Sequence, residues 1–351
     1  MNSEYVPFDM NAMGIPRSEE EFPLFFKLAK DSSSSSAAVS LQAVGSPPAV
    51  SLKTSYDLHS WTDYTVGDEL TIHQGEKLFF AGDNAKMATN ASNYNHFVIS
   101  GGTTEAHGNV MSLLSTDFKD YTNLTTSYAF NSLFIDCILL SRAPALPATY
   151  VASYSYMSMF RNCQSLAEAP ELPATTLRAS CYYHMFQDCH SMVKGPDVLP
   201  APKAYATCYR EMFRNCYSLK KAPVIMARAI EGNAYRMMFA RCESLVEAPE
   251  LPIMNLNEYC YYGMFNGCYS LTDAPELPAT SLVANCYDYM FANCTSLSAI
   301  SVAFTDWNTT NASTTDWVLN VPSGGTFTCP SDLPVNWGSA FIPSGWTVSN
   351  F

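Results

Sequence analysis

Four apolar positions recur along the middle of the chain in a fixed local arrangement. In one copy they are Tyr261, Met264, Phe265 and Cys268, which fall at i, i+3, i+4 and i+7. This spacing places four side chains on one face of a helix. The pattern therefore predicts one short amphipathic helix in each copy, with its apolar face turned inward.

The phenylalanine position shows how these copies are spaced. It recurs every 26 residues, with a single step of 27, at Phe134, Phe160, Phe186, Phe213, Phe239, Phe265 and Phe291. A fixed period of this length is typical of stacked repeats. About seven copies therefore predict a solenoid over residues 126–300, in which equivalent side chains lie above one another.

A polar and proline-containing segment follows each predicted helix. The residues before the repeated cysteines tolerate the left-handed conformation that ends helices; they include Asn162, Asp188, Asn215, Gly267 and Asn293. Leu166 and Leu172 then point inward on either side of Pro170, which limits regular pairing because it has no N–H. We expect one short parallel strand per repeat. Helix and strand together predict an α/β solenoid.

The segments on either side of the repeats have other patterns. Residues 38–125 contain short alternating apolar runs separated by turns such as Gly67-Asp68, and predict a β-rich antiparallel cap domain over the first repeat. Residues 301–351 predict a C-terminal cap whose aromatic side chains close the core. This segment holds four of the five tryptophans, Trp307, Trp317, Trp337 and Trp346. A carbohydrate-stacking site is the alternative for these rings.

The N-terminal segment is unlike the rest of the chain. Residues 1–30 contain an aromatic cluster, Phe22, Phe25 and Phe26, and residues 31–37 form a serine-rich linker. We interpret residues 1–30 as a docking or anchoring peptide; the alternative is that the phenylalanines pack on their own domain. The segment has no positive start, apolar stretch or cleavage site, so we expect either no secretory signal or one already removed.

Eleven of the twelve cysteines occupy two repeat positions, and only Cys329 stands outside them. A disulfide framework is less regular, and a zinc site has paired ligands at close spacing. Equivalent positions in stacked repeats form columns of small buried side chains. We therefore expect reduced, buried thiols.

Charge and motifs exclude several functions. The formal net charge is −13, whereas a nucleic-acid-binding protein needs a basic face, so we expect no nucleic-acid partner. No apolar run reaches the ~18–20 residues of a spanning helix, so we expect no membrane insertion. Dinucleotide, phosphate-loop, zinc-protease and serine-hydrolase motifs are missing. We therefore expect no enzyme, no catalytic residue, no cofactor and no metal site.

Charged residues recur at two surface positions of the repeat. The first position holds Glu168, Lys194, Lys221, Glu247 and Asp273, and the second holds Glu171, Asp197, Glu250 and Glu276. Paired carboxylates can carry out glycoside hydrolysis, but this regular recurrence favours a solvated face. These nine side chains are our candidate binding residues, and the lysines reduce the repulsion between stacked carboxylates.

Two segments carry a resemblance to a known family. They read MFNGCYSL at 264–271 and APELPAT at 274–280. Together with their other copies they resemble the BspA-like leucine-rich repeat proteins of gut Bacteroidetes, over about half of the chain. Residues 75–82, 108–114 and 342–348 also look like the leader and ending of such proteins. The family implies adhesion and protein binding rather than catalysis.

The function we expect combines this resemblance with the N-terminal segment. The hypothesis is a bacteriophage virion component, a fibre, spike or decoration protein on the virion surface. Its N-terminal peptide would bind a virion protein, and its repeats would attach to a host surface protein or glycan. A fibre would suggest a homo-oligomer. The alternative is a BspA-like adhesin on the surface of Bacteroidetes cells.

Overall fold

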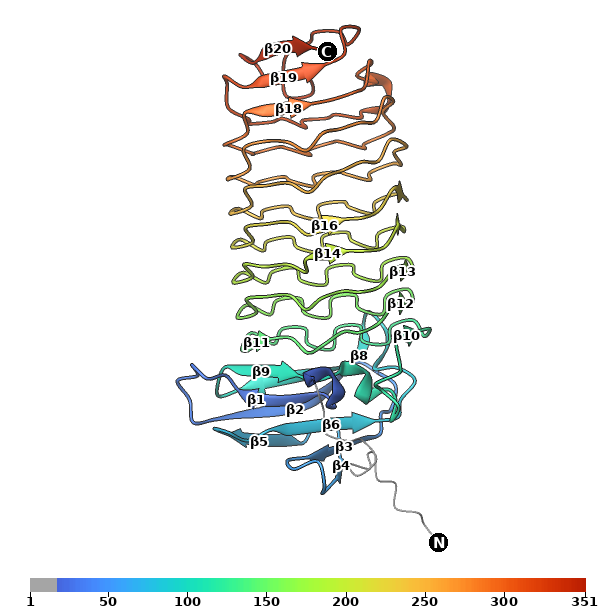
Figure 1. Ribbon diagram of the computed structural model, residues 1–351, viewed down its shortest axis with the longest axis vertical. Coiled ribbons are helices and arrows are strands. Elements are labelled where there is room, and N and C mark those ends of the chain that lie inside the picture. The colour runs from blue at the N-terminus through green and yellow to red at the C-terminus, as the bar shows by residue number, and fades with distance from the viewer. Residues whose placement is uncertain (1–17) are drawn as a thin grey trace.

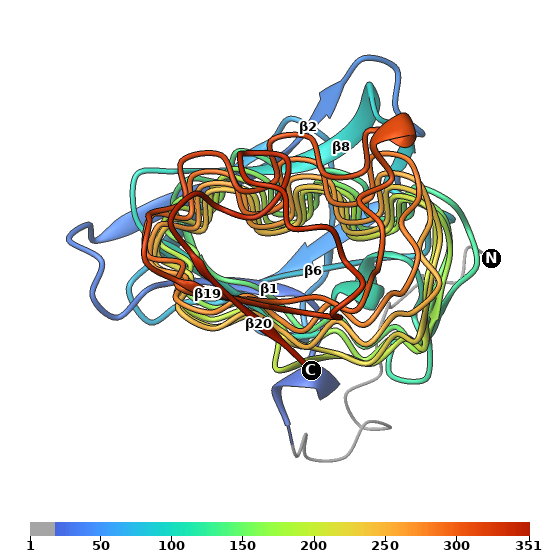
Figure 2. The same cartoon turned by 90° about the horizontal axis from the view of Figure 1, so that it is seen from above.

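The computed structural model describes residues 18–351, which form an elongated molecule in three parts (Figure 1). Twisted β-sheets occupy the N-terminal end. Coils of similar outline are stacked above them along the long axis, and a smaller sheet closes the C-terminal end. Seen along this axis, the outlines of the coils superpose, and one side of each coil is a row of small turns (Figure 2).

Two sheets make up the N-terminal β domain. Their strand orders are β11-β9-β1-β6-β3-β4 and β5-β2-β8-β7. The strands are β1 (Phe25–Leu28), β2 (Ser36–Val44), β3 (Leu52–Ser55), β4 (Thr62–Tyr64), β5 (Glu69–His73), β6 (Leu78–Gly82), β7 (Ala88–Asn90), β8 (Asn93–Ser100), β9 (Thr104–His107) and β11 (Leu140–Arg142). Most neighbours are antiparallel, but β11 pairs with β9 in parallel and so joins the sheet to the first coil.

Very short parallel strands connect the coils. They are β10 (Asn123–Leu124), β12 (Tyr150–Val151), β13 (Thr176–Leu177), β14 (Val198–Leu199), β15 (Lys203–Ala204), β16 (Val224–Ile225) and β17 (Ala229–Ile230). The pairs β10 with β12, β12 with β13, β14 with β16, and β15 with β17 are all parallel, with partners 26 or 27 residues apart. The sequence period is therefore the length of one coil.

The α/β solenoid of leucine-rich repeats predicted from the sequence is wrong. Residues 18–351 contain no α-helix; their only helical segments are the 3₁₀ turns η1 (Glu19–Glu21), η2 (Val110–Leu113) and η3 (Thr309–Asn311). The segments that carry the Tyr, Met, Phe and Cys pattern are runs of consecutive turns. The described chain is thus built of several small sheets and turns.

The backbone conformation explains why these segments are not helices. Every fourth residue is left-handed: in one copy Tyr154, Ser158 and Asn162 have φ of 61°, 53° and 60°. A right-handed helix needs negative φ at each position, so three such residues exclude it. A turn that repeats every four residues still brings positions i and i+4 to the same side. The apolar spacing therefore fits both structures.

Backbone hydrogen bonds in the turns alternate between two directions. The Met159 N–H donates to the Tyr156 carbonyl in its own turn at 3.2 Å, whereas the Phe160 N–H donates to the Met185 carbonyl of the next coil at 2.9 Å. In an α-helix both bonds would stay within the segment. Half of these amides therefore hold neighbouring coils in register.

Stacked aromatic rings fill the interior of the coils. Phenylalanines at the repeated position stack with ring centroids 5.3–5.8 Å apart, from Phe134 to Phe291. Tyrosines from Tyr156 to Tyr287 form a second column at 5.5–6.0 Å. Both columns are buried. The core of the molecule is therefore continuous along the stack.

The cysteines lie in this core as free thiols, as expected. All twelve are buried and unpaired. Seven of them, from Cys137 to Cys294, donate a hydrogen bond from Sγ to a phenylalanine carbonyl at 3.0–3.2 Å. Burial raises the pKa of the Cys294 thiol to about 12, so the reactive thiolate is disfavoured.

Three parallel strands close the C-terminal end. They are β18 (Ala299–Ser301), β19 (Thr326–Cys329) and β20 (Thr347–Asn350). Trp307, Trp317 and Trp346 are buried there, and each indole N–H donates to a backbone carbonyl. Trp337 is about half exposed at 49%. Three of the four rings are therefore packing elements of a cap.

Replacing Gly263 with alanine tests the turn conformation. Gly263 has φ of +57° in the middle of a repeated segment. In a helix the change would stabilise the protein by ~0.5–1 kcal/mol, but in a left-handed turn it should destabilise by about 1 kcal/mol. Urea unfolding gives the sign. Gly195→Ala is the control, because its Cβ would make only ordinary contacts, the nearest at 3.5 Å from Phe213; equal effects in both variants would contradict the turn assignment.

Candidate binding groove

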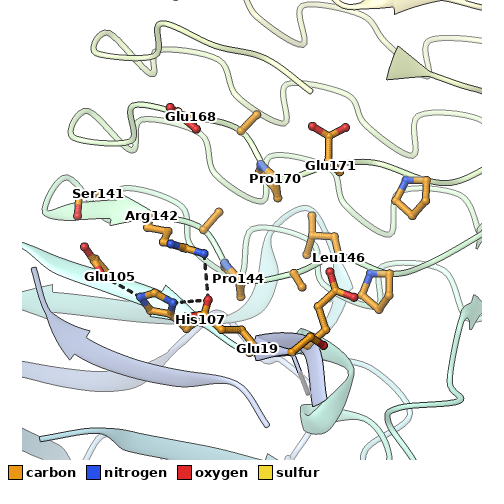
Figure 3. A pocket seen from close by; sticks show the side chains of 18 of the residues that line it. Glu19, Glu105, His107, Ser141, Arg142, Pro144, Leu146, Glu168, Pro170 and Glu171 are labelled. Atoms are coloured by element: carbon orange, nitrogen blue, oxygen red, sulfur yellow. Dashed lines mark hydrogen bonds and ion pairs between the residues drawn. The ribbon is translucent and has the colours of Figure 1, made fainter. Parts of the chain in front are cut away.

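A groove with a volume of about 850 Å³ lies where the β domain meets the first coils (Figure 3). Its walls come from η1, β9, β11 and residues 143–149 and 167–173. Four prolines line it, Pro144, Pro147, Pro170 and Pro173. Since proline has a fixed φ and no N–H, these four positions are rigid and offer no backbone donor.

His107 is the most enclosed titratable side chain of the groove. Only 1% of its side chain is exposed, and its ring is stacked on Phe25 with centroids 5.1 Å apart. Nδ1 lies 2.9 Å from Glu19 Oε2, and Nε2 lies 2.8 Å from Glu105 Oε2 (Figure 3). Each ring nitrogen therefore has a carboxylate oxygen within hydrogen-bond distance.

Further cations complete this cluster. Arg142 Nη2 lies 2.9 Å from Glu19 Oε2, and Lys27 Nζ lies 3.1 Å from Glu105 Oε2. The strands place them: Lys27 on β1 faces Glu105 on the neighbouring β9, and Arg142 on β11 lies beside them. Glu19 and Glu105 are therefore neutralised within the chain.

Both carboxylates have a lowered pKa. For Glu19 the hydrogen bond with His107 is the main cause. For Glu105 burial alone would raise the pKa, but hydrogen bonds with His107 and Lys27 outweigh it. The ion pairs therefore stabilise the fold at neutral pH, and this contribution decreases as pH falls below the ordinary carboxyl range.

Three carboxylates in the groove have no cationic partner within residues 18–351, although Glu171 accepts a hydrogen bond from the Asp197 N–H. Glu20, Glu168 and Glu171 line it and form no ion pair with any group of residues 18–351. Each is exposed. The groove is thus an acidic surface with an apolar, proline-rich wall, which is suited to binding a cation rather than an anion.

The structure brings the predicted charged positions into columns. Glu168, Lys194, Lys221, Glu247 and Asp273 are joined in this order by parallel bridges between successive coils. At the second position, the Asp197 N–H donates to Glu171, and the Asp197 carboxylate pairs with Lys194 at 3.1 Å. All nine candidate binding residues are exposed. Only Glu168 and Glu171 reach the groove.

The predicted anchoring phenylalanines lie in the β domain. Phe25 and Phe26 are on β1, a strand inside the six-stranded sheet, and are 2% and 0% exposed. Phe22 is partly buried against Phe25 and Phe79. All three pack on their own domain, which is the alternative left open above. The rest of the predicted docking peptide, residues 1–17, lies outside the described residues.

Several groove residues were not identified from the sequence. Glu105 and His107 are two apart in a short extended segment, so their side chains share a face, and this was a usable signal. Glu19 and Arg142 had no such signal, because their partners are distant in the sequence. Glu19 is 88 residues from His107 and 123 residues from Arg142. The pairing of β1, β9 and β11 brings them together.

Comparison with known proteins adds no relative, since no protein-family model, curated protein or solved structure matches the chain. The resemblance to BspA-like proteins therefore stays a prediction. Within residues 18–351, no helix has the length and apolar character needed to cross a membrane. The same residues contain no group of three or more His, Cys, Asp or Glu side chains placed to hold a metal ion.

Proposed function

We propose that the chain is a non-enzymatic attachment protein that binds a cationic segment of a partner in the acidic groove. The observation that supports this most is the set of three unpaired carboxylates, Glu20, Glu168 and Glu171, around a proline-lined wall. Lysine or arginine side chains of a partner would pair with the carboxylates, and their aliphatic stems would pack on the proline rings.

The stack of coils that forms one wall of the groove favours this role. Glu168 and Glu171 lie three residues apart on one coil. Backbone hydrogen bonds and stacked rings join this coil to its neighbours. A preorganised surface binds more tightly because less freedom is lost on association. The rigid coil therefore supports recognition of a partner of defined shape.

Charge reversal in the groove tests the proposal. Tetralysine, titrated into the intact chain by calorimetry, should bind about tenfold more weakly to Glu168→Lys/Glu171→Lys than to the unchanged protein, because two attractions of ~0.2–1 kcal/mol each become repulsions. Added salt should weaken the binding to the unchanged protein.

The repeat offers a matched control. Glu247→Lys/Glu250→Lys makes the same change at the same two repeat positions, three coils further from the groove. It should leave tetralysine binding nearly unchanged. Equal losses in the two double variants would mean that only the overall charge matters and would contradict a groove site.

We also propose where the protein acts. A bacteriophage virion component, such as a fibre, spike or decoration protein, is supported by the resemblance of the repeat to host surface proteins and by the elongated stack. The partners would be a virion protein and a host surface protein or glycan. Mass spectrometry of purified virions should find this chain, and its absence would exclude the virion role. A Bacteroidetes cell-surface adhesin is the alternative, and the chain would then be recovered from the cell surface.

A further inference from the structure

A second surface, on the turn side of the coils, carries two arginines between two tyrosines at one repeat position. Tyr183, Arg210, Arg236 and Tyr262 each follow the buried tyrosine of their coil, so they occupy one position in four successive coils. We call these four residues the Arg/Tyr ladder. Backbone bonds fix its register: the Glu211 N–H donates to the Arg236 carbonyl at 2.9 Å, for example. All four side chains are half-buried.

The guanidinium groups of the ladder lie over tyrosine rings. Arg210 Cζ is 5.2 Å from the ring centroid of Tyr183, and Arg236 Cζ is 4.5 Å from that of Tyr262. The ring of Tyr259, which lies next to that of Tyr262, is 5.7 Å from the same Cζ. These cation–π contacts hold planar groups in fixed positions on the surface.

Arg236 differs from the other arginines on this side. Arg210 and Arg214 pair with Glu211, at 3.1 and 2.7 Å. Arg161 lies 3.9 Å from Asp188, and Arg241 lies 3.5 Å from Glu243. These four cations are compensated by carboxylates of the chain.

No carboxylate within residues 18–351 forms an ion pair with Arg236. Its one hydrogen bond runs from Nη1 to Asn233 Oδ1 at 3.4 Å, and its Nε is buried without a partner. A guanidinium has five N–H donors. Most donors of this group therefore have no acceptor among residues 18–351, and they lie beside the rings of Tyr259 and Tyr262.

We propose that the Arg/Tyr ladder binds a carboxylate-bearing sugar, in the form of a sialylated or uronic-acid glycan. The apolar face of a pyranose ring packs on a tyrosine ring, which also offers a hydroxyl for hydrogen bonding. The Arg236 guanidinium matches a carboxylate in a bidentate geometry. A neutral sugar would satisfy the ring but leave the arginine unpaired.

A polyanion fits this surface less well. Stacked rings and arginines also suit single-stranded nucleic acid, but the chain has a net charge of −13, and Glu211 lies directly beside the ladder. Closely spaced phosphates would be repelled by such a protein, whereas one carboxylate placed at Arg236 would not. The proposal deepens the attachment role by naming a glycan ligand, and it rests on that role but not on the groove.

Glycan titration of the intact chain tests the ladder. Each acidic sugar is compared with a neutral one: sialyllactose with lactose, and trigalacturonate with maltotriose. The first pair tests a sialylated glycan and the second a uronic-acid glycan. At least one acidic sugar should bind more tightly than its neutral counterpart, by about tenfold or more, because a hydrogen bond between two charged groups is stronger than one between neutral groups. Arg236→Gln should remove this preference, and Arg236→Lys should restore part of it.

Arg241→Gln is the matched control on the same side of the coils and should keep the preference. Equal binding of acidic and neutral sugars, or an acidic preference that survives in Arg236→Gln, would overturn the proposal. Tighter binding of an oligouridylate than of any sugar would overturn it in favour of nucleic acid. Tetralysine binding in the groove should be the same in all ladder variants, so failure of the ladder is distinguishable from failure of the groove.

Discussion

Replacing Phe213 with alanine should lower the free energy of unfolding by about 3–5 kcal/mol, the usual cost of removing a buried aromatic ring. Phe213 is fully buried between Phe186 and Phe239, with both ring centroids 5.6 Å away. Its loss would leave a cavity in the middle of the stack. Because each coil is stabilised mainly by its neighbours, the coils on either side would lose support together. The midpoint of urea unfolding measures the effect.

Tyr269→Ala is the control for this substitution. Tyr269 is 41% exposed in the same region of the stack, so its removal should change stability by about 0.5 kcal/mol or less. A loss from Phe213→Ala no larger than that from Tyr269→Ala would mean that the phenylalanine column is not the core.

Replacing Glu211 with alanine should destabilise the protein by about 3–5 kcal/mol, the range for breaking a buried ion pair. The Glu211 side chain is only 6% exposed and contacts Arg214 at 2.7 Å and His184 at 3.3 Å. Its removal would leave the Arg214 guanidinium and the His184 ring without their carboxylate partner. Glu243→Ala is the control. The Glu243 side chain, which pairs with Arg241, is 35% exposed, so its removal should lower the free energy of unfolding by less than about 1 kcal/mol.

The Glu211 carboxylate should also make the free energy of unfolding depend on pH. Burial alone would raise the pKa of Glu211, but hydrogen bonds with His184 and Arg214 bring it to about 2, below its ordinary value of 4.5. A lowered pKa in the folded state stabilises the protein above the ordinary pKa, and this contribution is lost as pH falls from 4.5 toward 2. The Glu211→Ala variant should therefore lose less stability over this range than the unchanged protein. Equal losses would contradict the ion-pair assignment.

Much of the packing could be predicted from the sequence. The 26-residue period identifies the repeats, and the apolar columns identify the buried tyrosines, phenylalanines and cysteines. The left-handed residues before the cysteines were also predicted: Asn162 and Gly267 have φ of 60° and 76°. These features depend on residue type and spacing alone, so a single sequence reveals them.

The helix could not be excluded from the sequence, because the spacing i, i+3, i+4 and i+7 fits a helix face and a four-residue turn equally well. The decisive positions are Ser158, Glu211 and Met237, which are left-handed although their residue types have no preference for it. Hydrogen bonds between coils impose this conformation: the Glu211 and Met237 N–H groups donate to carbonyls of the next coil. Such contacts cannot be read from one repeat.

The candidate sites were predicted only in part. Glu168 and Glu171 were singled out as surface charges and do line the groove. Their partners in that surface, His107 and Glu19, belong to the β domain, whose contact with the first coil depends on the parallel pairing of β11 with β9. The Arg/Tyr ladder was missed because its position holds different residue types in successive copies.

The central claim is that the repeats are stacked runs of turns in which every fourth residue is left-handed, because this conformation decides which side chains form the core, the groove wall and the ladder. Far-ultraviolet circular dichroism of the intact chain tests it most directly. We expect a spectrum of strands and turns without the paired minima of an α-helix, since residues 18–351 contain no α-helix. A helical signal equivalent to one short helix in each repeat would contradict the account.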